Sequence, residues 1–262
     1  MPGSDQQPGL PVLYLRSFAF WIVFAALIPV FAIALMLSFP FPFEKRFAVT
    51  RLWSRTTIAW LAFTCKLHYE VQGTENIPAT PGIIFSKHQS TWETLTLNFW
   101  FTPQSWVLKR ELLWLPFFGW GAYMMQPIAL NRSAGKKAIE QLVEQGCDRL
   151  HKGRWIIVFP EGTRTAPGAR TRYRIGGAVL AERSGYPVTP VAHNAGEYWP
   201  RNSFIKKPGT IQVRIGAPIQ SAGKRAQDIL AEAENWIETE MSRISTLQAP
   251  DQDQDIPPAP VN

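Results

Sequence analysis

Residues 82–94 read GIIFSKHQSTWET, and they place a short apolar run directly before a turn and the start of a helix. The run at residues 82–85 has the length and composition of a buried strand. After it, Ser90 is followed three residues later by Glu93, which is the spacing of a helix capping box. A strand that leads at once into a helix is typical of α/β proteins, so this stretch favours that class.

The same alternation continues through residues 46–247, which we expect to form the main domain. Further strand-like runs occupy residues 106–108, 155–159, 188–192 and 210–215. Helical segments are expected at residues 91–101, 134–152, 176–184 and 224–241. Strands that alternate with helices of this length predict an α/β fold built on a largely parallel, buried central sheet.

An uncharged segment, residues 17–43, precedes this domain. A helix needs about 20 apolar residues to cross the hydrocarbon core of a bilayer, so we expect residues 1–45 to anchor the chain in a membrane. Pro29, near the middle, leaves a single span and a re-entrant hairpin both open. Arg16 stands alone before the segment, whereas several basic residues follow it: Lys45, Arg46, Arg51 and Arg55. This bias places the main domain on the cytoplasmic side.

The region after the anchor mixes basic residues with large apolar ones, namely Phe47, Leu52, Trp53, Ile58 and Trp60. This pattern fits an amphipathic helix on an anionic membrane surface, and it fits equally a core helix with a solvated basic face. At the other end, residues 248–262 are rich in Pro, Asp and Gln. Such a segment cannot offset its ordering entropy by burial, so we expect a disordered tail.

The composition narrows the class of partner. The 262 residues include 27 Lys plus Arg and 20 Asp plus Glu, a formal net charge of +7. This excess suits an anionic membrane or an acidic substrate. Because no zinc-finger spacing or RNA-binding signature accompanies it, we expect no nucleic-acid partner. Cys65 and Cys147 lack metal-ligand neighbours and are expected to be reduced and structural.

The turn after residues 82–85 carries candidate acid–base chemistry. His88 and Glu93 can meet if the histidine folds back over the first helical turn. The carboxylate would then hold one ring nitrogen and leave the other to accept a proton near neutral pH. The alternative is a plain helix cap with a polar histidine beside it.

A second turn, FPEGTR at residues 159–164, follows another strand. Gly162 allows a close backbone approach, while Thr163 and Arg164 offer a hydroxyl and a planar guanidinium suited to phosphate. Glu161 is expected to orient a basic group or a hydroxyl. Lys109, directly after residues 106–108, is a further candidate to face the same cleft.

Together these motifs resemble the glycerolipid acyltransferase family, and most of all its bacterial lysophosphatidic acid acyltransferases. The H-x4-D motif of the family corresponds to residues 88–93, with Glu93 in place of the usual Asp. The K-x-E-L core is matched at residues 109–112, and the arginine-ending stretch at residues 128–132. FPEGTR is present intact, and a V-x-P-V-type strand is matched at residues 188–192.

The resemblance implies transfer of an acyl group from acyl-CoA or acyl-carrier protein to the sn-2 hydroxyl of 1-acylglycerol 3-phosphate, at the inner membrane. It implies His88 as general base and Glu93 as its orienting carboxylate, with no metal and no cofactor. The remaining candidates would bind or shape the substrate site: Lys109, Arg132, Glu161, Gly162, Thr163 and Arg164. Two alternatives stay open, an acyltransferase for another lysophospholipid or aminolipid, and a non-catalytic membrane-anchored lipid-binding protein.

Overall fold

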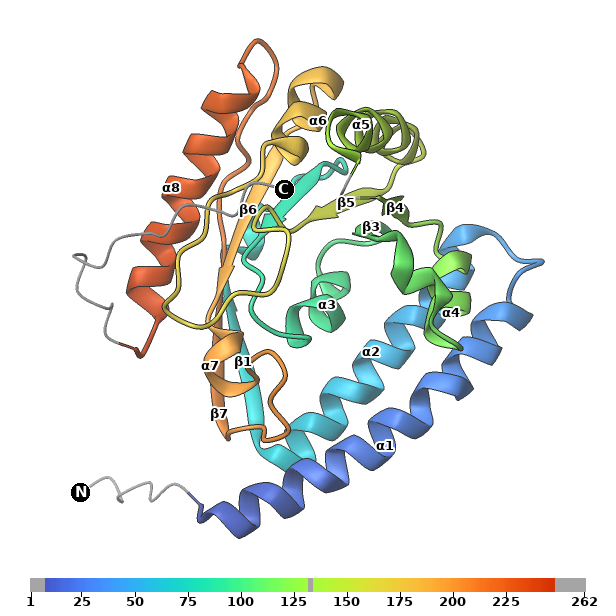
Figure 1. Cartoon of the computed structure of the whole chain (residues 1–262), viewed down its shortest axis with the longest axis vertical. Helices are drawn as coiled ribbons and strands as arrows, with labels where there is room; N and C mark the ends of the chain where they lie inside the picture. The colour runs from blue at the N-terminus through green and yellow to red at the C-terminus, as the bar shows by residue number, and fades with distance from the viewer. Residues whose placement is uncertain (1–7, 132–133, 248–262) are drawn as a thin grey trace.

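A computed structural model describes residues 8–131 and 134–247, and within them the chain folds around a seven-stranded sheet of order β1-β7-β6-β2-β5-β3-β4 (Figure 1). Neighbouring strands run parallel, apart from the antiparallel pair β6 and β7. The largely parallel α/β sheet is thus confirmed. The strands are β1 (Leu67–Gln72), β2 (Ile83–Ser86), β3 (Gln104–Lys109), β4 (Ile128–Leu130), β5 (Trp155–Val158), β6 (Val188–His193) and β7 (Gly209–Ile215).

Strands β1 and β4 were not predicted from the sequence. β1 is an edge strand that pairs only with β7 among the named strands, and most of its side chains are exposed. Its sequence, LHYEVQ, therefore lacks the apolar run that marks a buried strand. β4 has three residues and pairs with β3 at the opposite edge. Both segments are strands because they pair with a neighbouring strand, and their own hydrophobic pattern does not indicate it.

Helices cover both faces of the sheet and bury a separate core on each side (Figure 1). One face packs against α5 (Lys136–His151), α6 (Gly176–Ser184) and α8 (Ala226–Ile244). The other packs against α1 (Leu10–Leu37), α2 (Phe43–Cys65) and α3 (Trp92–Thr96). Strand β2 contributes to both cores. Ile83 and Phe85 pack in the core beneath α5, α6 and α8, and Ile84 packs in the core on the opposite face.

Shorter helices complete the described chain. The expected helix at residues 91–101 is α3, which tightens into a 3-10 turn at Leu97–Phe99. A 3-10 turn at Arg110–Trp114 precedes α4 (Phe118–Met124), another lies at Thr74–Asn76, and α7 (Ala195–Tyr198) follows β6. These segments connect the sheet to the helices that surround it.

Helix α1 lies against α2 for much of its length and also contacts α4 (Figure 1). Within the described residues it is the one helix long and apolar enough to cross a membrane, with a mean hydropathy of 2.7 over its most apolar window. The Nε1 group of Trp60 donates to the carbonyl of Ala19 at 3.2 Å, and that of Trp21 donates to the carbonyl of Phe204 at 3.0 Å. The anchor segment is therefore bonded to the main domain.

Helix α2 begins at Phe43, so the expected boundary after residue 45 falls inside its first turn. It buries Phe47, Ile58 and Leu61, and it packs between α1 and α3. The helix thus contributes to the core, while Leu52 on the same helix is 57% exposed. The expected disordered tail, residues 248–262, lies outside the described residues.

Candidate active site

The two turns singled out in the sequence lie side by side, because β2 and β5 are paired neighbours that run in the same direction. The carboxyl ends of parallel strands meet at one edge of a sheet, where helices begin. The N–H of Thr165 donates to the carbonyl of His88 at 2.8 Å. In return, the N–H of His88 donates to Oε2 of Glu161 at 3.1 Å. The FPEGTR turn is thus bonded to the histidine turn through the backbone.

His88 and Glu93 contact each other directly, with 2.9 Å between Nδ1 and Oε1. The same oxygen accepts the N–H groups of Gln89 and Ser90 at 2.9 and 2.8 Å. Because an ionised carboxylate only accepts, Nδ1 carries the ring proton and Nε2 presents its lone pair. The His88 ring stacks on Phe159 with 3.9 Å between centroids, and the side chain is 16% exposed. This arrangement can accept a proton from a bound hydroxyl.

Glu93 also helps to start α3, so the two interpretations of this turn hold together. It accepts the N–H of Ser90, as the carboxylate of a capping box does. The hydroxyl of Ser90 accepts the N–H of Trp92 at 3.1 Å, one residue earlier than in the standard box. One buried carboxylate thereby organises the helix start and the histidine.

A second histidine, His193 at the end of β6, lies on the far side of Glu93. Its Nε2 is 3.9 Å from Oε2 of Glu93, and it donates to the carbonyl of Lys87 at 2.8 Å. Burial lowers the pKa of His193 in spite of the nearby carboxylate, so this ring is neutral. For Glu93, burial raises the pKa, but the hydrogen bonds from His88 and from the N–H of Ser90 oppose that shift, and the pKa lies below its ordinary value. Glu93 is therefore ionised.

Basic side chains gather around the FPEGTR turn. Nη1 of Arg164 donates to the Thr91 hydroxyl at 2.9 Å, at the start of α3. Nη1 of Arg201 lies 3.5 Å from the Thr163 hydroxyl and 3.3 Å from the carbonyl of Arg164. Gly162 has a φ of 73°, a left-handed backbone that favours glycine. Thr163 and Arg164 thus stand where the sequence predicts a phosphate-binding turn.

Arg174 lies against the same glycine. A Cβ placed on Gly162 would stand 2.6 Å from Nε of Arg174. Neither Arg174 nor Arg201 was predicted, because each belongs to a loop that carries no motif. Only the close approach of those loops to residues 159–164 identifies them.

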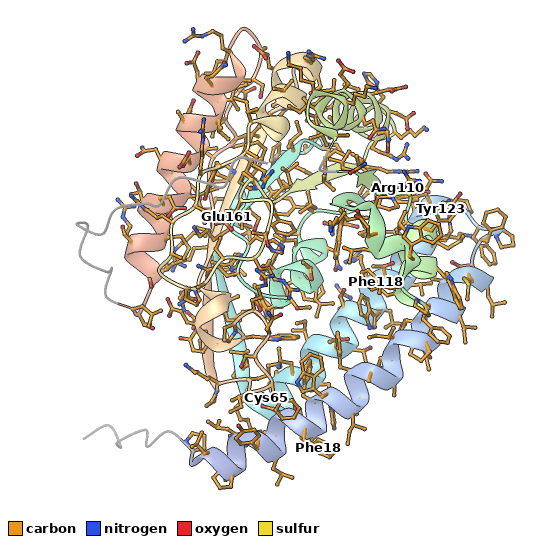
Figure 2. All side chains as sticks on the ribbon, viewed as in Figure 1. Phe18, Cys65, Arg110, Phe118, Tyr123 and Glu161 are labelled. Atoms are coloured by element: carbon orange, nitrogen blue, oxygen red, sulfur yellow. The ribbon has the colours of Figure 1, made fainter. Side chains whose placement is uncertain are left out.

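Glu161 is buried near the centre of the molecule (Figure 2). Its Oε2 accepts from the N–H of His88 and from the Thr165 hydroxyl at 3.2 Å, and its Oε1 lies 2.8 Å from Nζ of Lys87. Burial raises the pKa of Glu161, and Lys87 opposes that shift. The expected orienting contact to a basic group is present, and its partner is Lys87. Nothing in the sequence pattern pointed to this lysine.

Lys109 stands apart from this cluster of contacts. Lys109 ends β3 with an exposed side chain, and its Nζ lies 3.9 Å from Oε2 of Glu111. Arg132 lies outside the described residues. Cys65 and Cys147 are free thiols, and burial raises the pKa of both, which makes them poor nucleophiles. Within residues 8–131 and 134–247, no group of three or more His, Cys, Asp or Glu side chains is placed to hold a metal ion.

Comparisons with known proteins agree with this geometry. Residues 68–194 match a family model described as Acyltransferase. A 1-acyl-sn-glycerol-3-phosphate acyltransferase of Pseudomonas aeruginosa is 46% identical over 211 residues, which cover 79% of this chain and 82% of that protein. The alpha form of the enzyme of that name from Mus musculus is 28% identical, over 64% of this chain and 61% of that protein. The solved structure of the 1-acyl-sn-glycerophosphate acyltransferase PlsC from Thermotoga maritima superimposes with a TM-score of 0.74. It is 20% identical and covers 90% of this chain and 97% of its own, which shows a shared fold.

Proposed function

This chain belongs to the acyltransferase family, and we propose that it transfers an acyl group from a thioester to the sn-2 hydroxyl of 1-acylglycerol 3-phosphate, forming phosphatidic acid. The observation that carries the proposal is the 2.9 Å contact between His88 and Glu93 beside the FPEGTR turn. The relative from Pseudomonas aeruginosa, named for this acceptor, supports the choice of substrate.

In the proposed reaction, Nε2 of His88 takes the proton of the acceptor hydroxyl as its oxygen attacks the thioester carbonyl. Glu93 keeps Nδ1 protonated and stabilises the imidazolium that forms. The new C–O bond is complete when the C–S bond breaks, and the departing sulfur takes the proton back from His88. The acyl group passes directly between the substrates, which agrees with the raised pKa values of the two thiols.

The phosphate of the acceptor is proposed to lie against the FPEGTR turn. Arg164 supplies a guanidinium held at the start of α3, and Arg201 lies against the carbonyl of that same arginine. Guanidinium groups match phosphate oxygens in charge and geometry. Lys109 and Arg132 remain candidates for the same anion, as the motif resemblance implies.

An apolar cavity between α1, α2, β3 and α4 is proposed to hold an acyl chain. Its walls include Ala32 and Leu35 of α1, Trp53 of α2, Trp106 of β3 and Gly121 of α4. Hydrocarbon is stabilised by such walls at about 25 cal/mol per Å² of buried surface.

Substituting Gly121 by Leu fills the proposed acyl-chain cavity. The change should lower kcat/KM for long-chain donors more than for short-chain donors. Gly121→Ala is the matched control, because its methyl group would meet Ala32 and Leu35 at about 3.7 Å, an ordinary contact. An unchanged chain-length preference in Gly121→Leu would remove the cavity from the proposal.

We further propose that α1 anchors the enzyme at the cytoplasmic face of the inner membrane. The outer side of α1 exposes Leu15, Phe18, Ile22, Val30 and Ile33, while its inner side is packed against the domain. These contacts along the helix favour a position within one leaflet over a span that leaves the domain. Phe18, at the rim of the molecule in Figure 2, is well placed to enter lipid.

The direct test of the activity uses purified protein with 1-acylglycerol 3-phosphate, a panel of other lysolipids, and both acyl-CoA and acyl-carrier protein as donors. Formation of phosphatidic acid by the wild-type chain, and its loss in a folded His88→Ala variant, is the expected result. A preference for another lysolipid would favour the alternative acceptor. Lipid binding without turnover would favour the non-catalytic alternative.

A further inference from the structure

A buried lysine stands directly before the proposed base. The Lys87 side chain is 2% exposed, and its Nζ lies 2.8 Å from Oε1 of Glu161 and 2.7 Å from Oε1 of Glu238. A buried ammonium needs partners of this kind, because an unpaired buried charge costs several kcal/mol. One of these carboxylates belongs to the FPEGTR turn, and the other belongs to α8, close to the C-terminal end of the described chain.

Glu238 is itself held firmly. The hydroxyl of Tyr173 donates to its Oε1 at 2.9 Å, and Nε of Arg170 lies 3.4 Å from its Oε2. Burial, together with the charge of Glu238, raises the pKa of Tyr173, so the phenol stays protonated and donates. Glu238 therefore joins α8 to the loop that follows the FPEGTR turn as well as to Lys87.

The network continues to the histidine turn through Glu161. While Oε1 of Glu161 faces Lys87, its Oε2 accepts the N–H of His88 at 3.1 Å. On the other side, Nε2 of His193 donates to the carbonyl of Lys87 at 2.8 Å. The backbone that carries His88 is thus fixed from the side of α8 and from the side of β6.

We propose that Glu238 is a positioning residue for His88, acting through Lys87 and Glu161, an inference that rests on the proposed function. With Glu238 present, Lys87 is shared between two carboxylates, and Glu161 can keep its second oxygen on the N–H of His88. Without the charge of Glu238, Lys87 draws on Glu161 alone and pulls it away from that N–H. His88 then loses the orientation that lets it meet both Glu93 and the substrate hydroxyl.

The test is the variant Glu238→Gln, which keeps the size of the side chain and removes its charge. We expect kcat to fall at least tenfold, with KM for both substrates within about twofold of wild type, because Glu238 is proposed to act through Lys87 rather than on the substrates. Glu232→Gln is the matched control on the same helix, since Glu232 pairs with the exposed Lys224. It should keep wild-type kcat and KM.

A double-mutant cycle asks whether Glu238 works through Lys87. Lys87→Met alone should lower kcat, and adding Glu238→Gln to it should lower kcat by less than twofold more, because the connection is already broken. Thermal unfolding checks that each variant is folded. Should Glu238→Gln fail to fold, Glu238→Asp is the substitute variant. It keeps the negative charge but moves it away from Lys87 by one methylene, and its kcat should fall less than tenfold below that of wild type.

Three results would overturn the positioning role. They are a folded Glu238→Gln enzyme with the kcat of Glu232→Gln, a loss confined to KM, and fully additive losses in the cycle. A wild-type chain that acylates none of the acceptors refutes the proposed function instead. An active wild type with an inactive His88→Ala and an unaffected Glu238→Gln refutes the present inference alone.

Discussion

Replacing Glu93 by Gln is expected to lower kcat by about a thousandfold while the turn stays folded. Oε1 of Glu93 accepts three N–H groups, from His88, Gln89 and Ser90, at 2.8 to 2.9 Å. The oxygen of a glutamine amide at the same position can accept all three. The substitution therefore removes the charge of the group and keeps its geometry.

The size of the effect follows from the buried position of the pair. Glu93 is 0% exposed, so water screens its charge little. When His88 becomes an imidazolium, two opposite charges about 4 Å apart attract by about 4 kcal/mol at an effective dielectric constant of about 20. Each 1.36 kcal/mol corresponds to about a tenfold change in rate, so losing this attraction costs about 10³ in kcat.

Glu93→Ala separates the catalytic role from the capping role. It removes the acceptor as well as the charge, and it leaves the buried N–H groups of Gln89 and Ser90 without their partner. Each such orphaned group costs about 1–3 kcal/mol. We expect Glu93→Ala to lose about 2–6 kcal/mol of unfolding free energy, whereas Glu93→Gln loses about 1 kcal/mol.

The assay follows release of the free thiol from the donor, with urea unfolding in parallel. Glu144→Gln on the exposed side of α5 is the control and should match wild type in both measurements. A Glu93→Gln enzyme with kcat within tenfold of wild type would refute the electrostatic argument. A Glu93→Ala protein with wild-type unfolding free energy would refute the hydrogen-bond argument.

Three further predictions concern other parts of the chain. Arg164→Ala should raise the KM for the phosphate-bearing acceptor about tenfold or more and change kcat little; steady-state kinetics at varied acceptor checks this, and an unchanged KM contradicts it. Gly162→Ala should lose about 1–2 kcal/mol of unfolding free energy and most activity, because it adds backbone strain and a methyl group 2.6 Å from Nε of Arg174. Gly153→Ala is the control, because Gly153 also has a positive φ but has open space around it; it should lose similar stability and keep its activity. Equal activity in the two variants would contradict the predicted effect of Gly162→Ala on the site. Burial lowers the pKa of Lys206 from 10.5 to about 7, so between these values the unfolded chain binds more protons and the unfolding free energy rises with pH. Lys206→Met should remove that rise in urea unfolding at pH 7 and pH 9, and equal slopes would show that Lys206 does not cause it.

Local patterns were enough to predict most of the sheet and the two turns. The buried strands are short apolar runs bounded by breakers, and the motif residues His88, Glu93 and Arg164 lie within continuous stretches of chain. Strand β1 was not predicted, because an exposed edge strand has no apolar run in its sequence. Arg201 was not predicted because it contacts Thr163 and Arg164 from 38 and 37 positions along the chain.

The sequence by itself determined the class of the fold, the apolar N-terminal helix, and the two turns that are proposed to carry the chemistry, because these depend on the composition and spacing of neighbouring residues. Only the tertiary structure decided that α2 packs between α1 and α3, that α1 is bonded to the domain, and that Lys87 lies between Glu161 and Glu238. Lys87 and Glu238 are 151 positions apart, and no local periodicity links them. The fold buries the ammonium of Lys87, and a buried charge is stable only beside an opposite charge. Helix α8 supplies that charge through Glu238.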